Sequence, residues 1–121
     1  MEIIYETTVH SIGPEAASFL AERMLVTFGD NAPEELRDFC YCVDVNPCRR
    51  RLKIGDTMVI DGVRYPITAV GGVAQRNLES LGHVTLVLDG AADPRMDGSI
   101  HVAAESAPEM HVGSSISVEA S

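Results

Sequence analysis

The chain has 121 residues, of which 45% are hydrophobic and 22% are charged, so its composition is that of a globular protein rather than a disordered one. Eighteen acidic and nine basic residues give a formal net charge of −9, which argues against a general nucleic-acid binder because such proteins need clustered cations. No apolar run approaches the roughly 20 residues that span a bilayer, and no secretory signal opens the chain. We therefore expect one cytoplasmic domain over residues 1–121.

The first part of the chain predicts strands that alternate with brief helices. Residues 1–12 alternate loosely between apolar and polar side chains and predict a strand. A short helix is expected over 14–23, because proline suits the first helical turn. Met24–Phe28 is a compact apolar run and predicts a second strand. A brief helix at 33–36 and a strand at 39–45 follow.

The clearest local signal is a hairpin in the second half of the chain. Residues 57–60 and 63–67 flank Asp61-Gly62, a pair that tolerates the positive φ angles of a type I′ turn. A short helix is expected over Ala74–Leu81, with Gly82 as its C′ residue. Three more strands are predicted at 83–88, 100–103 and 115–118.

Many short strands with only two or three short helices favour a mainly β fold. We expect a small closed or partly open β-barrel of about six strands, because closure removes the edges that short strands expose. A doubly wound α/β sheet is disfavoured, since the chain has too few crossover helices.

Three cysteines, Cys40, Cys42 and Cys48, lie within nine positions. An odd and crowded set is a poor disulfide framework, so we expect reduced thiols. Cys40 and Cys42 are two residues apart on a predicted strand, so their side chains face the same side. Together with Cys48 they could hold a soft metal ion. A zinc ion would need a fourth ligand, such as a histidine. The alternative is three small core and loop side chains. No cofactor is expected.

A basic cluster at Arg49, Arg50, Arg51 and Lys53 holds four of the nine cations. It is typical of a clamp for an anion or of a docking patch for an acidic partner protein. A solvated loop that offsets the surrounding acids is the other interpretation.

Four histidines, His10, His83, His101 and His111, are candidates for chemistry. A histidine accepts a phosphoryl group when one ring nitrogen is deprotonated and exposed. A hydrogen-bonded structural histidine is the alternative for each of them.

A long block of the sequence resembles one family. The residues that carry the resemblance are Arg64-Tyr65-Pro66-Ile67-Thr68-Ala69-Val70-Gly71, Leu81-Gly82-His83-Val84-Thr85, Asp89-Gly90 and, in the flanks, Ile4-Tyr5, Cys40 and His101-Val102-Ala103. They are similar to the glucitol/sorbitol-specific enzyme IIA component of the bacterial sugar phosphotransferase system, over nearly the whole chain.

The resemblance implies a small β-barrel and a cytoplasmic phosphocarrier for sorbitol (glucitol) uptake. A histidine of the family takes a phosphoryl group from HPr and passes it to the IIB domain of the sugar transporter. The implied partners are therefore HPr and a sugar-specific IIB/IIC component, with the membrane approached only through that transporter. The oligomeric state, including a homo-oligomer, stays open.

The sequence departs from the family at the phosphate acceptor. By the resemblance, the acceptor histidine corresponds to Val43, and a second histidine to Val45; valine has no lone pair to attack phosphorus. Three hypotheses follow. The chain uses Cys42, Asp44 or His83 as the acceptor, it is an inactive homologue that binds or regulates, or it uses its three cysteines for thiol or metal chemistry. His101 lies in a matched motif and is a candidate binding residue.

Overall fold

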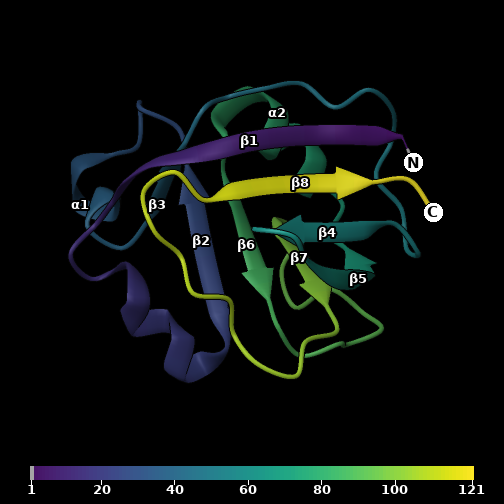
Figure 1. Ribbon diagram of the computed structural model, residues 1–121. Helices are drawn as coiled ribbons and strands as arrows, with labels where there is room; N and C mark the ends of the chain where they lie inside the picture. The colour runs from purple at the N-terminus through teal and green to yellow at the C-terminus, as the bar shows by residue number, and fades with distance from the viewer. Residues whose placement is uncertain (1) are drawn as a thin grey trace.

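In the computed structural model, which describes residues 2–121, eight strands close into a barrel in the order β1-β3-β2-β6-β7-β5-β4-β8 (Figure 1). The predicted mainly β barrel is confirmed, and it is fully closed. The expected count of about six strands is low by two, and β3 has only three residues. The strands are β1 (Ile3–Ile12), β2 (Met24–Phe28), β3 (Tyr41–Val43), β4 (Thr57–Ile60), β5 (Val63–Val70), β6 (Val84–Val87), β7 (Ser99–Val102) and β8 (Ser115–Glu119).

Three short helices lie in the connections between strands. The short helix expected at 14–23 is present as a 3-10 helix, η1 (Ala16–Glu22). The α1 helix (Glu34–Arg37) follows Pro33 and joins β2 to β3, which run parallel. The α2 helix (Ala74–Leu81) agrees with the predicted span and ends at Gly82, whose φ of 68° is left-handed as a C′ glycine requires. No helix in residues 2–121 is long and apolar enough to cross a membrane.

The β4–β5 hairpin has the predicted turn. Asp61 and Gly62 have φ angles of 50° and 84°, and a type I′ turn needs a positive φ at both central positions. Asp61 also accepts hydrogen bonds from the Ser114 hydroxyl at 2.7 Å and the Ser115 N–H at 2.9 Å. The turn is thereby tied to the start of β8.

Aliphatic side chains from all sides fill the interior of the barrel. The largest fully buried ones are Ile4, Leu25, Ile60, Ile67, Leu88 and Ile100. A second, smaller cluster lies by α1 and consists of Phe28, Ala32 and Cys40, with Val26 and Leu81 packed against it. Tyr41 and Val43 belong to the main cluster, so consecutive residues of the β3 region pack into two different clusters.

Asp56 lies just before β4 and is completely buried. Arg50 donates two hydrogen bonds to its carboxylate, at 2.8 and 3.1 Å, and the N–H groups of Lys53 and Ser121 donate at 2.9 and 3.1 Å. Burial alone would raise the pKa of Asp56, but these donors outweigh it and hold the pKa below its ordinary value. One carboxylate thus fastens the basic loop and the end of the chain to the barrel.

We expect the protein to lose stability in acid. The pKa values of Asp56, Asp61 and Asp89 are all lowered in the folded state. Their contribution is therefore fully present above the unfolded pKa, about 4, and is lost as the pH falls through the lower folded values. Urea unfolding at pH 7, 5, 4 and 3 measures it. An unfolding free energy that stays constant below pH 4 would contradict this expectation.

Candidate functional site

Val43 lies in the barrel interior, with 1% of its surface exposed. It pairs with Val9 of β1, and its Cγ2 atom lies 3.3 Å from where a Cβ on Gly82 would stand. Val45 approaches Gly29 in the same way, at 2.5 Å, and the Gly29 N–H donates to the Leu81 carbonyl. The positions where the resemblance expects histidines therefore adjoin the segment that leads into His83.

His83 is held by one ring nitrogen. Its Nδ1 atom lies 3.0 Å from the carbonyl oxygen of Thr27, and its ring stacks on Phe28 with centroids 4.3 Å apart. Because a carbonyl only accepts, Nδ1 carries the hydrogen and Nε2 keeps its lone pair. Within residues 2–121, Nε2 has no hydrogen-bond partner. A neutral histidine fixed in this tautomer is a nitrogen nucleophile.

His83 lines a groove of about 390 Å³ beside α1. Its walls are largely apolar, and Leu36 and Phe39 are substantially exposed there. Among the described residues that line the groove, Glu35 is the only one with a carboxylate, and none is an arginine or a lysine. The complete lining is Phe19, Val26, Glu35, Leu36, Phe39, Cys40 and His83.

The other two predicted acceptors, Asp44 and Cys42, differ in their exposure to solvent. Asp44 has 64% of its side chain exposed, and its backbone carbonyl accepts a hydrogen bond from the Thr7 hydroxyl at 2.7 Å. Cys42 is buried, with 4% exposed, and its strand partners are Ser11 and Phe28. A partner protein reaches Asp44 from solvent, whereas it reaches Cys42 only after local rearrangement.

His10, one of the four histidines of the sequence but not one of the three expected acceptors, is a further polar group at this end of the barrel. Its Nε2 atom lies 3.0 Å from Asp30 and 3.9 Å from Asp44. It stands where the register of β1 against β3 shifts, between Val9 and Ser11. The sequence pattern carries no signal for this irregularity, so the approach of His10 to the two carboxylates was not predictable from it.

His101 is buried, with 1% exposed, and both of its ring nitrogens are occupied. Nδ1 lies 2.8 Å from the Asp89 carboxylate, and Nε2 accepts the Arg95 N–H at 2.8 Å and lies 3.2 Å from the Ser99 hydroxyl. Burial alone would raise the pKa of Asp89, but His101 and the Ala91 N–H bring it below its ordinary value. This is the arrangement of a structural histidine that fixes the loop between β6 and β7.

The predicted basic cluster divides into residues with different surroundings. Arg50 is paired with the buried Asp56. Arg49 and Arg51 are exposed, and Arg51 lines a groove beside α2. The three arginines therefore do not form one clamp.

The three cysteines are not brought together. Cys40 packs in the small cluster by α1, whereas Cys48 packs against the barrel core. Burial raises the pKa of Cys40 to about 11 and that of Cys48 to about 12, which keeps both thiols neutral at pH 7. Within residues 2–121, no three histidine, cysteine or acidic side chains gather closely enough to hold a metal ion.

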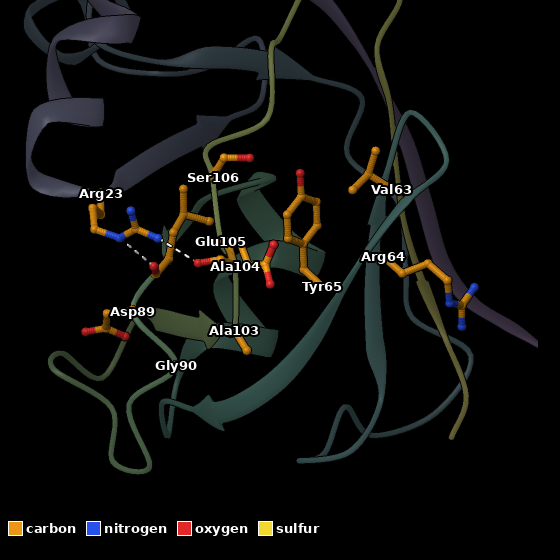
Figure 2. Close-up of a pocket in the computed structure, with 11 residues that line it drawn as sticks. Arg23, Val63, Arg64, Tyr65, Asp89, Gly90, Ala103, Ala104, Glu105 and Ser106 are labelled. Carbon is orange, nitrogen blue, oxygen red and sulfur yellow. Dashed lines mark hydrogen bonds between the residues drawn. The ribbon is translucent and has the colours of Figure 1, made fainter.

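A larger hollow of about 880 Å³ lies against β5 (Figure 2), and none of the predicted acceptors lines it. Arg23 spans one side of it and donates to the carbonyls of Leu88 and Ala104, each at 2.8 Å (Figure 2). Arg23 has a left-handed φ of 58° at the end of η1. Its guanidinium thus joins the β6 end to the loop after β7, and Tyr65 forms part of the floor.

Comparison with known proteins supports the relationship that the motifs indicated. The family model described as "PTS system glucitol/sorbitol-specific IIA component" matches residues 4–117. The glucitol/sorbitol-specific EIIA components of Shigella flexneri and Escherichia coli (strain K12) are each 38% identical over 119 residues, which cover 98% of this chain and 97% of theirs. The crystal structure of a PTS system IIA component from Enterococcus faecalis V583 has a TM-score of 0.82 and 26% identity, with coverage of 96% of this chain and 100% of that chain. The chain belongs to the glucitol/sorbitol-specific IIA component family of the sugar phosphotransferase system.

Proposed function

We propose that this chain is a IIA phosphocarrier that accepts its phosphoryl group on Nε2 of His83. Membership of the family supports a place between an HPr-type donor and a IIB-type acceptor in the cytoplasm. The observation that carries the assignment is the hydrogen bond from Nδ1 to the Thr27 carbonyl, which leaves a lone pair on Nε2 at a groove. Val43 has no such atom.

The transfer needs one nitrogen nucleophile and alignment. The Nε2 lone pair attacks phosphorus, the phosphorus–nitrogen bond of the donor's phosphohistidine breaks, and its electron pair returns to the donor nitrogen. In the second step the phosphorus–nitrogen bond to His83 breaks and a nucleophile of the IIB partner takes the phosphoryl group. The Thr27 carbonyl keeps the Nδ1 proton in place through both steps and stabilises the positive charge that develops on the ring.

Position 43 and His83 are linked through Gly82. Val43 Cγ2 lies 3.3 Å from the position of a Cβ on Gly82, next to His83 in sequence. A donor that reaches His83 docks at the groove beside α1. The exposed Leu36 and Phe39 offer it an apolar contact.

The second candidate function is an inactive homologue that docks the same partners without accepting phosphate. Two observations favour it. Val43 is a core residue, and the described residues that line the groove at His83 include a carboxylate but no cation to neutralise a phosphoryl group. A phosphoryl group beside Glu35 would experience repulsion rather than stabilisation.

Intact mass after incubation with phosphoenolpyruvate, enzyme I and HPr separates the two functions. We expect the protein to gain one phosphate and to lose it in acid, as phosphohistidine does. His83→Asn should abolish the gain, because it removes Nε2, whereas the exposed His111→Asn should keep it.

Two outcomes would overturn the assignment. No gain in the unaltered protein, while an authentic IIA component in the same reaction is phosphorylated, would leave the docking function. A gain that survives in His83→Asn would move the acceptor elsewhere, and peptide mapping would then distinguish His10, Cys42 and Asp44. Circular dichroism of both variants verifies that they are folded.

A further inference from the structure

A second groove, of about 830 Å³, runs between residues 51–52 and α2, on a different part of the barrel surface from His83. The connection from β3 to β4 passes α2 here (Figure 1). Gln75 fixes it by accepting the Leu52 N–H at 2.8 Å and donating to the Arg50 carbonyl at 3.0 Å. Glu79 accepts the Cys48 N–H at 2.8 Å. Three hydrogen bonds to one helix make this wall a preorganised surface.

The charges of the groove are opposite to those of the protein as a whole. Arg51 and Arg76 line it and are exposed, and neither guanidinium has a carboxylate partner within residues 2–121. Asp56 is paired with Arg50, and Glu79, whose carboxylate accepts the Cys48 N–H, is the one negative charge among the described residues that line the groove. In a chain with eighteen acids and nine bases, two neighbouring arginines without acidic partners mark a place that favours an anion.

The other two hollows have no excess of positive charge among their described lining residues. The hollow against β5 is lined by two arginines and two acids, Arg23, Arg64, Asp89 and Glu105, and the groove at His83 has Glu35 alone. The α2 groove has two arginines against one acid, Glu79, which is already hydrogen-bonded. Among the three it is the only one whose described lining residues have a net positive charge.

The backbone at the start of α2 adds hydrogen-bond donors to the same groove. Val73 occupies the N-cap position and its side chain caps nothing. The Val73 and Ala74 N–H groups donate to the carbonyls of Asp97 and Gly71, which leaves those of Gln75 and Arg76 for an external acceptor. Gly72 lines the groove, and a Cβ placed on it would meet nothing within 4 Å. A ligand can therefore approach the backbone closely at this point.

We propose that this groove binds the phosphate group of a small phosphorylated metabolite, with Arg51 and Arg76 as the charged contacts. Arginine matches phosphate oxygens with paired N–H donors. The groove is open to solvent, so a small ligand can enter it directly. The inference is independent of the role of His83 and gives the chain a site through which phosphorylated products could regulate it.

Isothermal titration calorimetry with glycerol 3-phosphate and with inorganic phosphate, at about 0.15 M salt, tests the proposal. We expect saturable binding of one equivalent of glycerol 3-phosphate. Arg51→Gln and Arg76→Gln should each weaken it by about tenfold, because each removes a charge-assisted contact. Arg49→Gln is the matched control, since Arg49 is exposed in the same loop but does not line the groove, and it should change the affinity by less than about twofold.

Three results would overturn the proposal. They are no binding of either probe at this salt concentration, an equal loss in Arg49→Gln, and undiminished binding when Gly72→Leu places a side chain in the open space of the groove. The same titration in His83→Asn keeps the two proposals apart, because the groove should bind with unchanged affinity when phosphate transfer is lost.

Discussion

Replacing Asp56 by alanine is expected to lower the free energy of unfolding by about 3 kcal/mol or more. The carboxylate is fully buried and accepts from Arg50, Lys53 and Ser121, so its loss leaves two backbone N–H groups and one guanidinium without their acceptor. Unsatisfied buried donors each cost about 1–3 kcal/mol. Urea unfolding at pH 7, followed by circular dichroism, gives the difference.

Two variants sharpen this experiment. Asp93→Ala removes an exposed acid that has no partner within residues 2–121, and it should leave the unfolding free energy nearly unchanged. Asp56→Asn keeps an acceptor for the N–H groups but loses the charge that faces Arg50. Its unfolding free energy should therefore lie between those of Asp56→Ala and Asp93→Ala. Equal unfolding free energies for Asp56→Ala and Asp93→Ala would show that the buried carboxylate is not a structural anchor.

Replacing His101 by leucine is expected to cost about 2 kcal/mol and to loosen the loop between β6 and β7. The imidazole satisfies the Arg95 N–H and the Asp89 carboxylate at once, and leucine, although of similar size, satisfies neither. Limited proteolysis should then cut within residues 90–98 faster than in the unaltered protein. His111→Leu, on an exposed side chain, is the control.

A contrary result for His101 would also be informative. If His101→Leu unfolded at the same urea concentration as the parent and resisted protease equally, the hydrogen bonds to Asp89 and Arg95 would contribute nothing net. On the proposal that His83 is the acceptor, phosphate transfer should persist in His101→Leu, since both ring nitrogens of His101 are occupied in the interior.

Local chemistry made much of the fold predictable. Asp61-Gly62 determines its turn because few other pairs accept two positive φ angles, and Gly82 ends α2 for the same steric reason. Pro14 and the apolar spacing predict a short helix at η1, but over seven residues they do not distinguish an α-helix from the 3-10 helix that forms. All eight strands overlap segments that the sequence predicts as strands, but how many of them join one closed barrel is a tertiary property, and the expected count of about six was low.

The site was less predictable than the fold. The family motif directed attention to His83, but its tautomer depends on a carbonyl 56 residues away in the sequence. Arg50 looked like part of an exposed clamp, and only the folded chain shows that it pairs with a buried carboxylate. The α2 groove depends likewise on contacts between Gln75 and the loop before β4. Composition and residue spacing alone do not predict these long-range contacts.

The pairing of β1 with β8 joins the two ends of the chain, with Ile3 opposite Glu119 and the Ala120 N–H on the Glu2 carbonyl. Both ends lie at the side of the molecule away from α1 (Figure 1). During synthesis, β1 emerges from the ribosome before its partner β8. The barrel therefore cannot close until residues 115–119 have also emerged. Until then, the edge of β1 that later pairs with β8 is exposed in the nascent chain. A chaperone that binds exposed strand edges can bind it during that interval.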